Sequence, residues 1–416
     1  MLLRTIRYCR ARPQPILPAA KHFHHLLLPF PLPVFHLNRG LRSSKPVSIV
    51  SHINTSYSSS SSPSINQSPL SLSPSSSTST HQRNKPNQSL QERETFSNKA
   101  MVALLVATTT DPASINPANA LLAMPGWQPR PHFQDDMKSF VNEGLRVLLH
   151  GKSIVVEDDL DKRWEEVTGE VIDEVIFFSK HTAVSNKPAL TVHPIGVPHL
   201  REGDVPPQGG KPGWAALPNP RIGPWLRLLK NMAQAHNLVP EFEITLEATH
   251  HGPLTNKPTM FLEIGSTEDY WKRQDAAQVM AQLVWEGLGL GGGTDVGNWS
   301  RENANKKVLL GIGGGHYVPR HMDVVLKDDV WVGHLLSGYS LPMEDPNQSK
   351  RETNVEIGGT WRDSIKAAYE ATRSAFPGGE ILAHLDHKSF KSWQKNAITG
   401  FLVEQNIKIG KPNNFS

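Results

Sequence analysis

Residues 245–266 read TLEATHHGPLTNKPTMFLEIGS, and they contain the end of one strand, a break, and a second strand that leads into a helix. Up to the break, over 241–249, apolar and polar side chains alternate with the period of two that is typical of a strand. Gly252-Pro253 predicts that this strand ends. FLEIG is predicted as the next strand, and apolar residues at helical spacing follow it, with Ser266 as the N-cap and Asp269 as its capping-box partner. This succession indicates an α/β fold.

Strands and helices continue to alternate over residues 101–416. The pattern favours one α/β domain with a central mixed sheet that helices flank on both faces. The predicted strands are 101–107, 173–178, 189–193, 241–249, 259–264, 306–312 and 379–385. The predicted helices are 221–236, 267–286, 360–375 and 389–404. The connection 197–224 is long and rich in Pro and Gly, which is typical of a functional loop.

The first hundred residues have a different composition. Residues 1–91 contain no Asp or Glu but many Arg and Ser, which is typical of an organellar transit peptide and predicts a chloroplast or mitochondrial location. The alternatives are a plain disordered tail or a leader that is not translated. Translation from Met101 would instead give a cytoplasmic form with access to the nucleus. The apolar patch of this leader, broken by prolines, is too short to span a bilayer, so no membrane partner is expected.

The net charge and cysteine content of residues 101–416 limit the kinds of nucleic-acid surface and metal site that they can form. Residues 1–100 hold 12 Lys and Arg and 2 acids, which leaves 43 − 12 = 31 basic and 39 − 2 = 37 acidic side chains, a formal charge of −6. A nucleic acid would therefore bind a local basic patch. Cys9 is the only cysteine, so a metal site in residues 101–416 must use His and carboxylates.

Histidines gather where predicted strands end. His250 and His251 close the first strand of the opening stretch, and Glu263 lies in the next. The carboxyl ends of strands are where α/β sheets hold ligands. Two further groups follow strands: VLLGIGGGHYVPRH, with His316 and His321, and ILAHLDHKSF, with its own pair of histidines. A glycine turn with two surface histidines is the alternative for the first of these.

Several common enzyme classes lack support. The glycine run at 311–315 is neither a G-x-G-x-x-G fingerprint nor a Walker loop, and the H-E-x-x-H spacing is absent. It also has no G-x-S-x-G nucleophile elbow, which leaves water as the favoured nucleophile.

Five blocks together resemble the D-aminoacyl-tRNA deacylase family of the archaeal and plant type. These blocks are HPIGVPHLREG, TLEATHHGP, EIGSTEDYWKRQDAAQVMAQLVWEGL, GIGGGHYVPRHMD and VGHLLSGYSLP. The resemblance covers residues 101–416 and implies hydrolysis of the ester between a D-amino acid and the 3′ end of tRNA. It also implies zinc dependence, little selectivity for the amino acid, activity on aldehyde-modified substrates, and a fold of the phosphorylase and peptidyl-tRNA hydrolase class.

The resemblance and the residues together suggest roles. Candidate zinc ligands are His250, His251, Glu263, His316 and His321. Candidate catalytic groups are Glu247 as general base, His251, His316, and the Gly314 and Gly315 amides facing the oxyanion. For each single histidine, a structural role stays open. A mechanism without protein-bound metal, assisted by the ribose 2′-OH, also stays open.

The expected partner is the aminoacyl end of tRNA, with a free D-amino acid as product and a monomeric enzyme. Basic groups would hold the phosphates. The candidates are Lys211, Arg221, Lys257, Lys272, Arg273 and Arg320. The lysine run Lys388, Lys391 and Lys395 is a further basic stretch, or the solvated face of a helix. Two other functions stay open, a nucleoside phosphorylase-like enzyme and a non-catalytic tRNA-binding protein.

Overall fold

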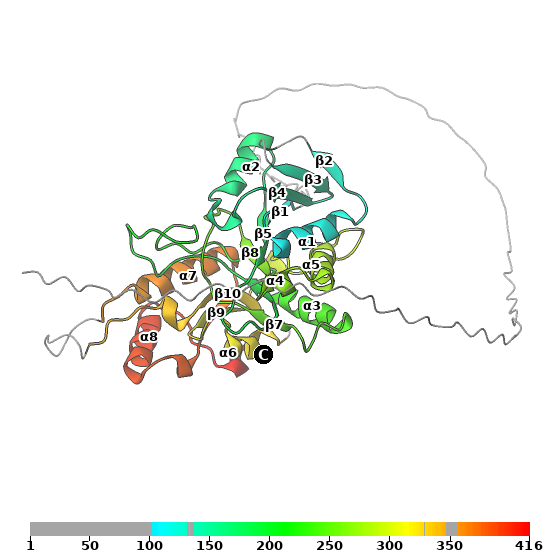
Figure 1. The fold of residues 1–416 in the computed structure, drawn as a ribbon. Helices are drawn as coiled ribbons and strands as arrows, with labels where there is room; N and C mark the ends of the chain where they lie inside the picture. Colours follow the sequence, from blue (N-terminus) through cyan, green and yellow to red (C-terminus); the bar gives the residue numbers. More distant parts are fainter. Residues whose placement is uncertain (1–100, 131–132, 134–136, 328, 347–356) are drawn as a thin grey trace, which may run out of the picture. The chain divides into compact units, whose positions relative to one another are not determined.

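The computed structural model describes residues 101–416 apart from 131–132, 134–136, 328 and 347–356 (Figure 1). The transit-peptide prediction for residues 1–100 lies outside the described residues. Within the described part, no helix has both the length and the apolar character needed to cross a membrane.

An eight-stranded mixed sheet forms the centre of the fold. β1, β4, β5 and β8 run parallel to one another; β6 pairs antiparallel to β8, and β2 and β3 extend the other edge antiparallel. The strand order is β2(Gln128–Arg130), β3(Lys138–Asn142), β4(Leu145–His150), β1(Ala103–Thr108), β5(Glu174–Lys180), β8(Thr259–Gly265), β6(Ala189–His193), β7(Glu243–Leu246). β1 is buried along its whole length, as expected for a central strand covered on both faces.

Three strands near the C-terminus form a second, parallel sheet. Its order is β10(Trp331–Leu336), β9(Lys307–Ile312), β11(Glu380–Leu385). The predicted strands 306–312 and 379–385 thus belong to a sheet of their own beside the central one. The two sheets meet after β7, where the amides of Ala248 and Thr249 donate to the carbonyls of His316, in the turn after β9, and of Leu335 in β10. The predicted strand 241–249 thus ends at Leu246, and its last residues join the two sheets.

Helices cover the sheets. α1, α3 and α5 pack in one apolar core against one face of the main sheet, while α2 packs on the other face through Trp164, and α7 and α8 cover the second sheet. The helices are α1(Pro112–Leu122), α2(Leu160–Thr168), α3(Ile222–Ala235), α4(Glu268–Trp271), α5(Gln274–Gly287), α6(Pro319–Val325), α7(Trp361–Ala375) and α8(Ser392–Glu404). The prediction of a helix-flanked mixed α/β fold is confirmed.

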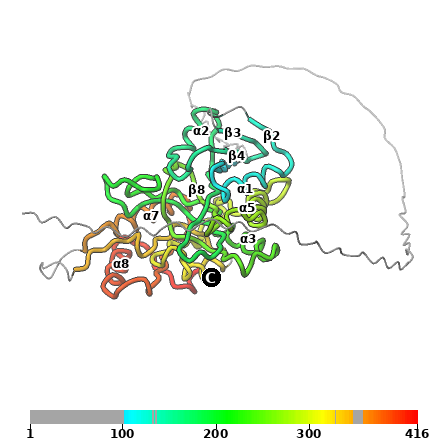
Figure 2. Tube along the Cα trace, viewed as in Figure 1, coloured from blue at the N-terminus to red at the C-terminus, as the bar shows by residue number. Residues whose placement is uncertain are grey.

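The long loop after β6 is ordered. Figure 2 shows its green trace beside the start of α7, and the hydroxyls of Thr360 and Ser364 donate to the carbonyls of His199 and Pro198. Another part of the loop returns to the end of the first strand of the opening stretch, where the Gly252 amide donates to the Gln208 carbonyl. The loop therefore brings Gln208 to the residues that follow β7.

The predicted helix 267–286 is two helices, α4 and α5. Arg273 leaves the helical region, with a ψ of 113°, and its guanidinium pairs with Glu241 and Asp275. The prediction of Ser266 as N-cap is also wrong, because α4 begins one residue later with Thr267 as its N-cap, and the Ser266 hydroxyl donates to the Lys187 carbonyl.

Candidate active site

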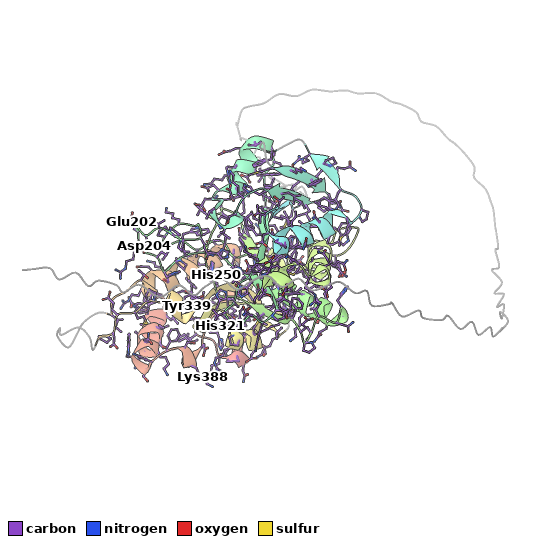
Figure 3. The ribbon with its side chains drawn as sticks, viewed as in Figure 1. Glu202, Asp204, His250, His321, Tyr339 and Lys388 are labelled. Atoms are coloured by element: carbon purple, nitrogen blue, oxygen red, sulfur yellow. The ribbon has the colours of Figure 1, made fainter. Side chains whose placement is uncertain are left out.

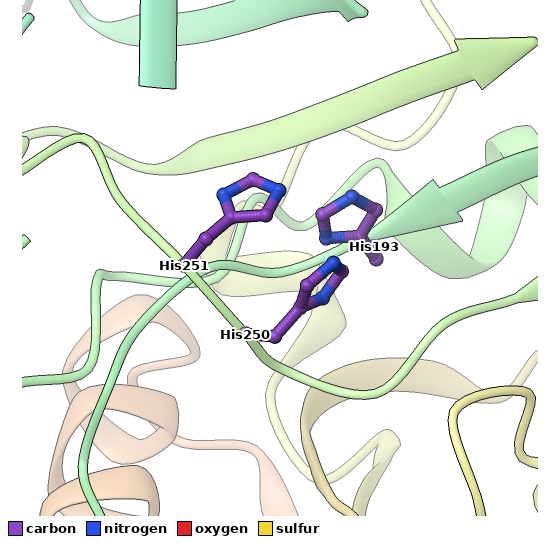
Figure 4. A group of neighbouring side chains, drawn as sticks. All are labelled: His193, His250 and His251. Atoms are coloured by element: carbon purple, nitrogen blue, oxygen red, sulfur yellow. The ribbon is translucent and has the colours of Figure 1, made fainter. Parts of the chain in front are cut away.

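Three histidine rings meet where β6 and β7 end (Figure 4). His193 is the last residue of β6, and His250 and His251 follow β7. Adjacent side chains of an extended strand point to opposite faces, but His251 has a left-handed φ of 44°. The centroid of the His250 ring consequently lies 4.3 Å from that of His251 and 4.5 Å from that of His193.

Backbone carbonyls fix the tautomer of all three rings. The Nδ1 atoms of His193, His250 and His251 lie 3.1, 2.8 and 2.5 Å from the carbonyl oxygens of Pro194, Ala248 and Gly252. Each Nδ1 must carry the hydrogen, because a carbonyl only accepts. Each Nε2 is therefore left with a lone pair. One ring nitrogen of each histidine lies within 4.8 Å of the other two.

Glu247 lies between two further imidazoles. Its carboxylate is fully buried, with Oε1 2.9 Å from His181 Nδ1 and Oε2 2.8 Å from His316 Nε2. One nitrogen of each imidazole therefore faces the buried carboxylate. The His181 and His316 rings stack with their centroids 5.1 Å apart. A buried carboxylate and two imidazoles thus form a second group beside the three histidines.

Glu263 of β8 lies under both groups. Its carboxyl oxygens are 3.7 Å from His193 Nε2 and 3.8 Å from His181 Nδ1. Burial raises the pKa of Glu263 well above its ordinary value, and the Glu247 carboxylate adds to that rise. The two buried acids therefore differ: burial also acts to raise the pKa of Glu247, but His181 and His316 hold it well below its ordinary value.

Burial keeps the three converging histidines neutral. It lowers the pKa of His193 to about 4 and that of His251 to about 3, and it lowers the pKa of His250 well below its ordinary value. His316 behaves differently. Burial lowers the pKa of His316, but contact with Glu247 outweighs this effect and raises it.

A cleft of about 380 Å³ opens onto these groups. The histidine end is formed by His181, His250, His251 and His316, with Glu263 behind them. The opposite end follows the carboxyl ends of β1 and β4, and Gln208 of the long loop lies beside it. The side chains of the opposite end are Thr108, Thr110, Asp111, Ser153, Ile154 and Val155. The volume lies within the range of small-molecule sites.

The structure brings most of the candidate catalytic and metal residues together. Glu247, His250, His251 and His316 belong to the two adjoining groups, and Glu263 lies under both. His321 does not. It is buried in α6, where its Nε2 lies 3.2 Å from the Gly313 carbonyl oxygen and its Nδ1 lies 2.9 Å from His384 Nδ1. The prediction that His321 binds metal with the other candidates is therefore wrong.

The glycine turn also differs from expectation. The Gly314 amide donates to the Ser389 hydroxyl at 2.6 Å, so it is not available to an oxyanion. Gly315 is exposed and does not line the cleft. The turn instead positions His316, whose carbonyl accepts the Ala248 amide at 2.8 Å.

The candidate tRNA-binding residues do not line the cleft. Arg221 is 2% exposed and its guanidinium pairs with Glu174 and Asp295, so it cannot reach a phosphate and that prediction is wrong. Lys211 is exposed in the long loop. The others pair with acids: Lys257 with Glu165, Lys272 with Glu268, Arg273 with Glu241 and Asp275, and Arg320 with Asp386.

Sequence reasoning missed three residues of the site. Lys180 and His181, which line the cleft, come within three residues of the end of the predicted strand 173–178, and His193, which belongs to the group of three histidines, ends a predicted strand. The rule that singled out His250, a histidine at a strand end, applied equally to His181 and His193. The sequence does not show that these histidines converge, because their convergence depends on which strands are neighbours in the sheet.

Comparisons with known proteins show the family of the chain. A sequence model of the D-aminoacyl-tRNA deacylase family matches residues 168–410. A D-aminoacyl-tRNA deacylase from Arabidopsis thaliana is 74% identical over 317 residues, which are 76% of this chain and 100% of that protein. One from Pyrococcus horikoshii is 28% identical over 267 residues, 64% of this chain and 89% of that protein.

A solved structure has the same fold. The crystal structure of a conserved protein of unknown function gives a TM-score of 0.59 at 23% identity, covering 76% of this chain and 96% of that one. The matched residues 168–410 include both groups of histidines and acids described above. The chain belongs to the D-aminoacyl-tRNA deacylase family.

Proposed function

We propose that the cleft hydrolyses the ester that joins a D-amino acid to the 3′-terminal ribose of tRNA, releasing the amino acid and tRNA with a free hydroxyl. The observation that carries this proposal is the meeting of five histidines and two buried acids at one end of a cleft of about 380 Å³. Hydrolysis of an ester needs a group that takes a proton from water and groups that stabilise charge on the carbonyl oxygen.

His181 is the proposed proton acceptor. Its Nδ1 faces Glu247, so the carboxylate holds the hydrogen on that nitrogen and leaves Nε2 as the basic atom. Nε2 is buried and has no hydrogen-bond partner in the described part of the chain. An unpartnered buried acceptor is costly, which supports a role in which a water molecule or the substrate becomes its partner.

His316 is the proposed proton donor to the ribose oxygen that leaves. Its Nε2 is held by Glu247, and its Nδ1 lies 3.2 Å from the hydroxyl of Tyr339. The ring is thus oriented from both sides, and its side chain is 37% exposed, so it can meet a substrate. Water adds to the ester carbonyl and gives a proton to Nε2 of His181, the bond from the carbonyl carbon to the ribose oxygen breaks, and the ribose oxygen receives a proton from Nδ1 of His316.

We further propose that His193, His250 and His251 hold a zinc ion. Three observations support the fit. Each Nδ1 contacts a backbone carbonyl, the arrangement that orients metal-binding histidines, and burial keeps the rings neutral, as ligands must be. In addition, His193 Nε2 is buried without a hydrogen-bond partner among the described residues. A bound zinc ion would polarise the ester carbonyl and lower the pKa of a water molecule.

Broad acceptance of amino acids, including aldehyde-modified ones, is part of the proposal. The end of the cleft opposite the histidines is lined by short hydroxyl side chains, by the carboxylate of Asp111, and by Ile154 and Val155. This mixture of apolar, hydroxyl and acidic groups does not match one kind of side chain, so we expect selection to act on groups that all D-aminoacyl esters share.

The test compares matched D- and L-aminoacyl-tRNA carrying alanine, phenylalanine or aspartate, with the full chain. We expect release of all three D-amino acids at similar rates and little release of the L forms. Release of neither isomer, with phosphorolysis of a nucleoside, would favour a phosphorylase-like enzyme instead. Binding of tRNA with the ester left intact would indicate a non-catalytic protein.

A further inference from the structure

One aromatic side chain stands exposed at the rim of the cleft. Among the large apolar side chains of the described residues, Tyr339 is the one aromatic that is markedly exposed, at 54%. Its hydroxyl contacts Nδ1 of His316, which lines the cleft. Figure 3 labels Tyr339 together with His250 and Lys388. The exposed ring offers apolar surface that a ligand in the cleft can cover, directly beside a catalytic group.

The backbone under Tyr339 is anchored to the turn that carries His316. Tyr339 is the middle residue of η3(Gly338–Ser340), a short 3-10 helix. The Gly338 amide donates to the Gly314 carbonyl at 2.9 Å. Ser337 caps η3, since its hydroxyl accepts from the Ser340 amide. Little conformational entropy is therefore lost when another ring packs on Tyr339.

A lysine extends the same rim. The Ser389 hydroxyl that accepts the Gly314 amide belongs to η4(His387–Ser389), and exposed Lys388 is its neighbour in that helix. The Asp386 carboxylate, which pairs with Arg320, accepts the Lys388 amide and fixes the turn. An aromatic ring followed by a cation is the arrangement that binds the bases and phosphates of single-stranded nucleic acid.

We propose that Tyr339 and Lys388 bind the unpaired 3′ end of the RNA where it leaves the cleft. The ring of Tyr339 stacks on the base that precedes the terminal nucleoside, and the Lys388 ammonium pairs with the phosphates beyond it. This inference rests on the proposed function, because it requires the ester of the terminal nucleoside to lie against the histidines. It adds the path that the RNA follows out of the cleft, and it predicts that the enzyme prefers a polynucleotide to a bare aminoacyl nucleoside.

Two substrates with the same ester test the proposal: a D-aminoacyl-tRNA and the matching D-aminoacyl-adenosine, which has no preceding base. We expect Tyr339→Ala to raise KM for the tRNA by about 5- to 150-fold more than KM for the adenosine ester, because loss of one stacked base corresponds to a factor of this size. Tyr339→Phe keeps the ring and is expected to keep the preference for tRNA. Val403→Ala removes an exposed apolar side chain of α8 (64% exposed) and serves as the control.

Lys388 is tested by salt. Lys388→Ala is expected to weaken tRNA binding and to lower the slope of log KM against log salt by about 0.7, the value for one contact to a single strand. An unchanged slope would show that Lys388 does not contact the phosphates of the RNA.

Three results would overturn the role of Tyr339: an equal loss on both substrates for Tyr339→Ala, an unchanged KM for tRNA, or a loss of preference in Tyr339→Phe as large as in Tyr339→Ala. These are distinct from failure of the proposed function, in which the wild-type chain would cleave neither substrate.

Discussion

The carboxylate of Glu247 lies 2.9 Å from Nδ1 of His181, on the side of the ring away from its unpartnered Nε2. Glu247 comes from the junction between the two sheets, and His181 follows β5 of the main sheet. Their contact therefore exists only when the junction is folded. This relationship makes catalysis depend on how the second sheet meets the first.

If Glu247 acts by holding His181, removing either partner should cost similar activity. We expect His181→Ala and Glu247→Gln each to lower kcat by about 100- to 10,000-fold, the usual contribution of general acid-base groups. The double variant should lose little more than either single variant. Single-turnover release of D-alanine from D-alanyl-tRNA is the measurement. Fully additive losses would show that the two residues act separately.

Metal binding should follow the three converging histidines. Replacing His193, His250 or His251 with Ala is expected to reduce bound zinc, measured as metal per chain by elemental analysis after equilibrium dialysis. His236→Ala is the matched control, because His236 is exposed at the end of α3. If all three cleft variants retained the zinc of the wild type, the assignment of ligands would be refuted.

Arg221 is predicted to matter for stability and not for RNA. Its guanidinium contacts Glu174 at 2.8 Å, and both side chains are at most 3% exposed. Breaking a buried pair from one side leaves an uncompensated charge and costs about 3–5 kcal/mol. Arg221→Met should therefore lower the free energy of unfolding in urea by about this amount, while KM for tRNA stays at the wild-type value. A raised KM with unchanged stability would restore Arg221 as a tRNA contact.

Several parts of the fold could be predicted from the sequence because they are locally encoded. β5, β6, β8, β9 and β11 are apolar runs between chain breakers, and each lies within two residues of its predicted bounds. β10 was not predicted, and it contains Gly333 and His334 within an otherwise apolar run. The division into two sheets was not predicted either, because pairing between distant strands leaves no periodicity in the sequence.

The candidate site could be predicted as far as residue type and strand ends allow. His250, His251 and Glu263 were found, since strand ends and acids are visible in the sequence. That both adjacent rings face His193 depends on the positive φ of His251, which the sequence does not signal. The roles predicted for His321 and Gly314 were wrong because their hydrogen-bond partners, His384 and Ser389, lie far along the chain.

Stability should fall in mild acid because buried neutral histidines resist protonation. His334 donates from Nε2 to the Ala216 carbonyl and accepts the Thr249 hydroxyl at Nδ1, and burial lowers its pKa to about 4. Between its ordinary pKa near 6.5 and 4, the unfolded chain binds a proton that the folded chain does not. Stability is therefore complete above pH 6.5 and decreases as the pH falls toward 4.

At pH 5 this single group should cost about 2 kcal/mol relative to pH 7. His334→Gln can keep a donor and an acceptor but does not titrate. Urea denaturation of both proteins between pH 5 and 7.5 measures the difference in slope. Identical slopes would show that His334 titrates in the folded protein as it does in the unfolded chain.

The most direct measurement is a crystal structure of the chain with a D-alanyl amide of 3′-amino-3′-deoxyadenosine, which has the shape of the ester but resists hydrolysis. We predict that its amide carbonyl lies between His181 and His250, with the adenosine in the cleft of about 380 Å³. Binding elsewhere, such as in the cavity of about 330 Å³ beside Arg221 and Trp299, would contradict the assignment of this cleft as the active site.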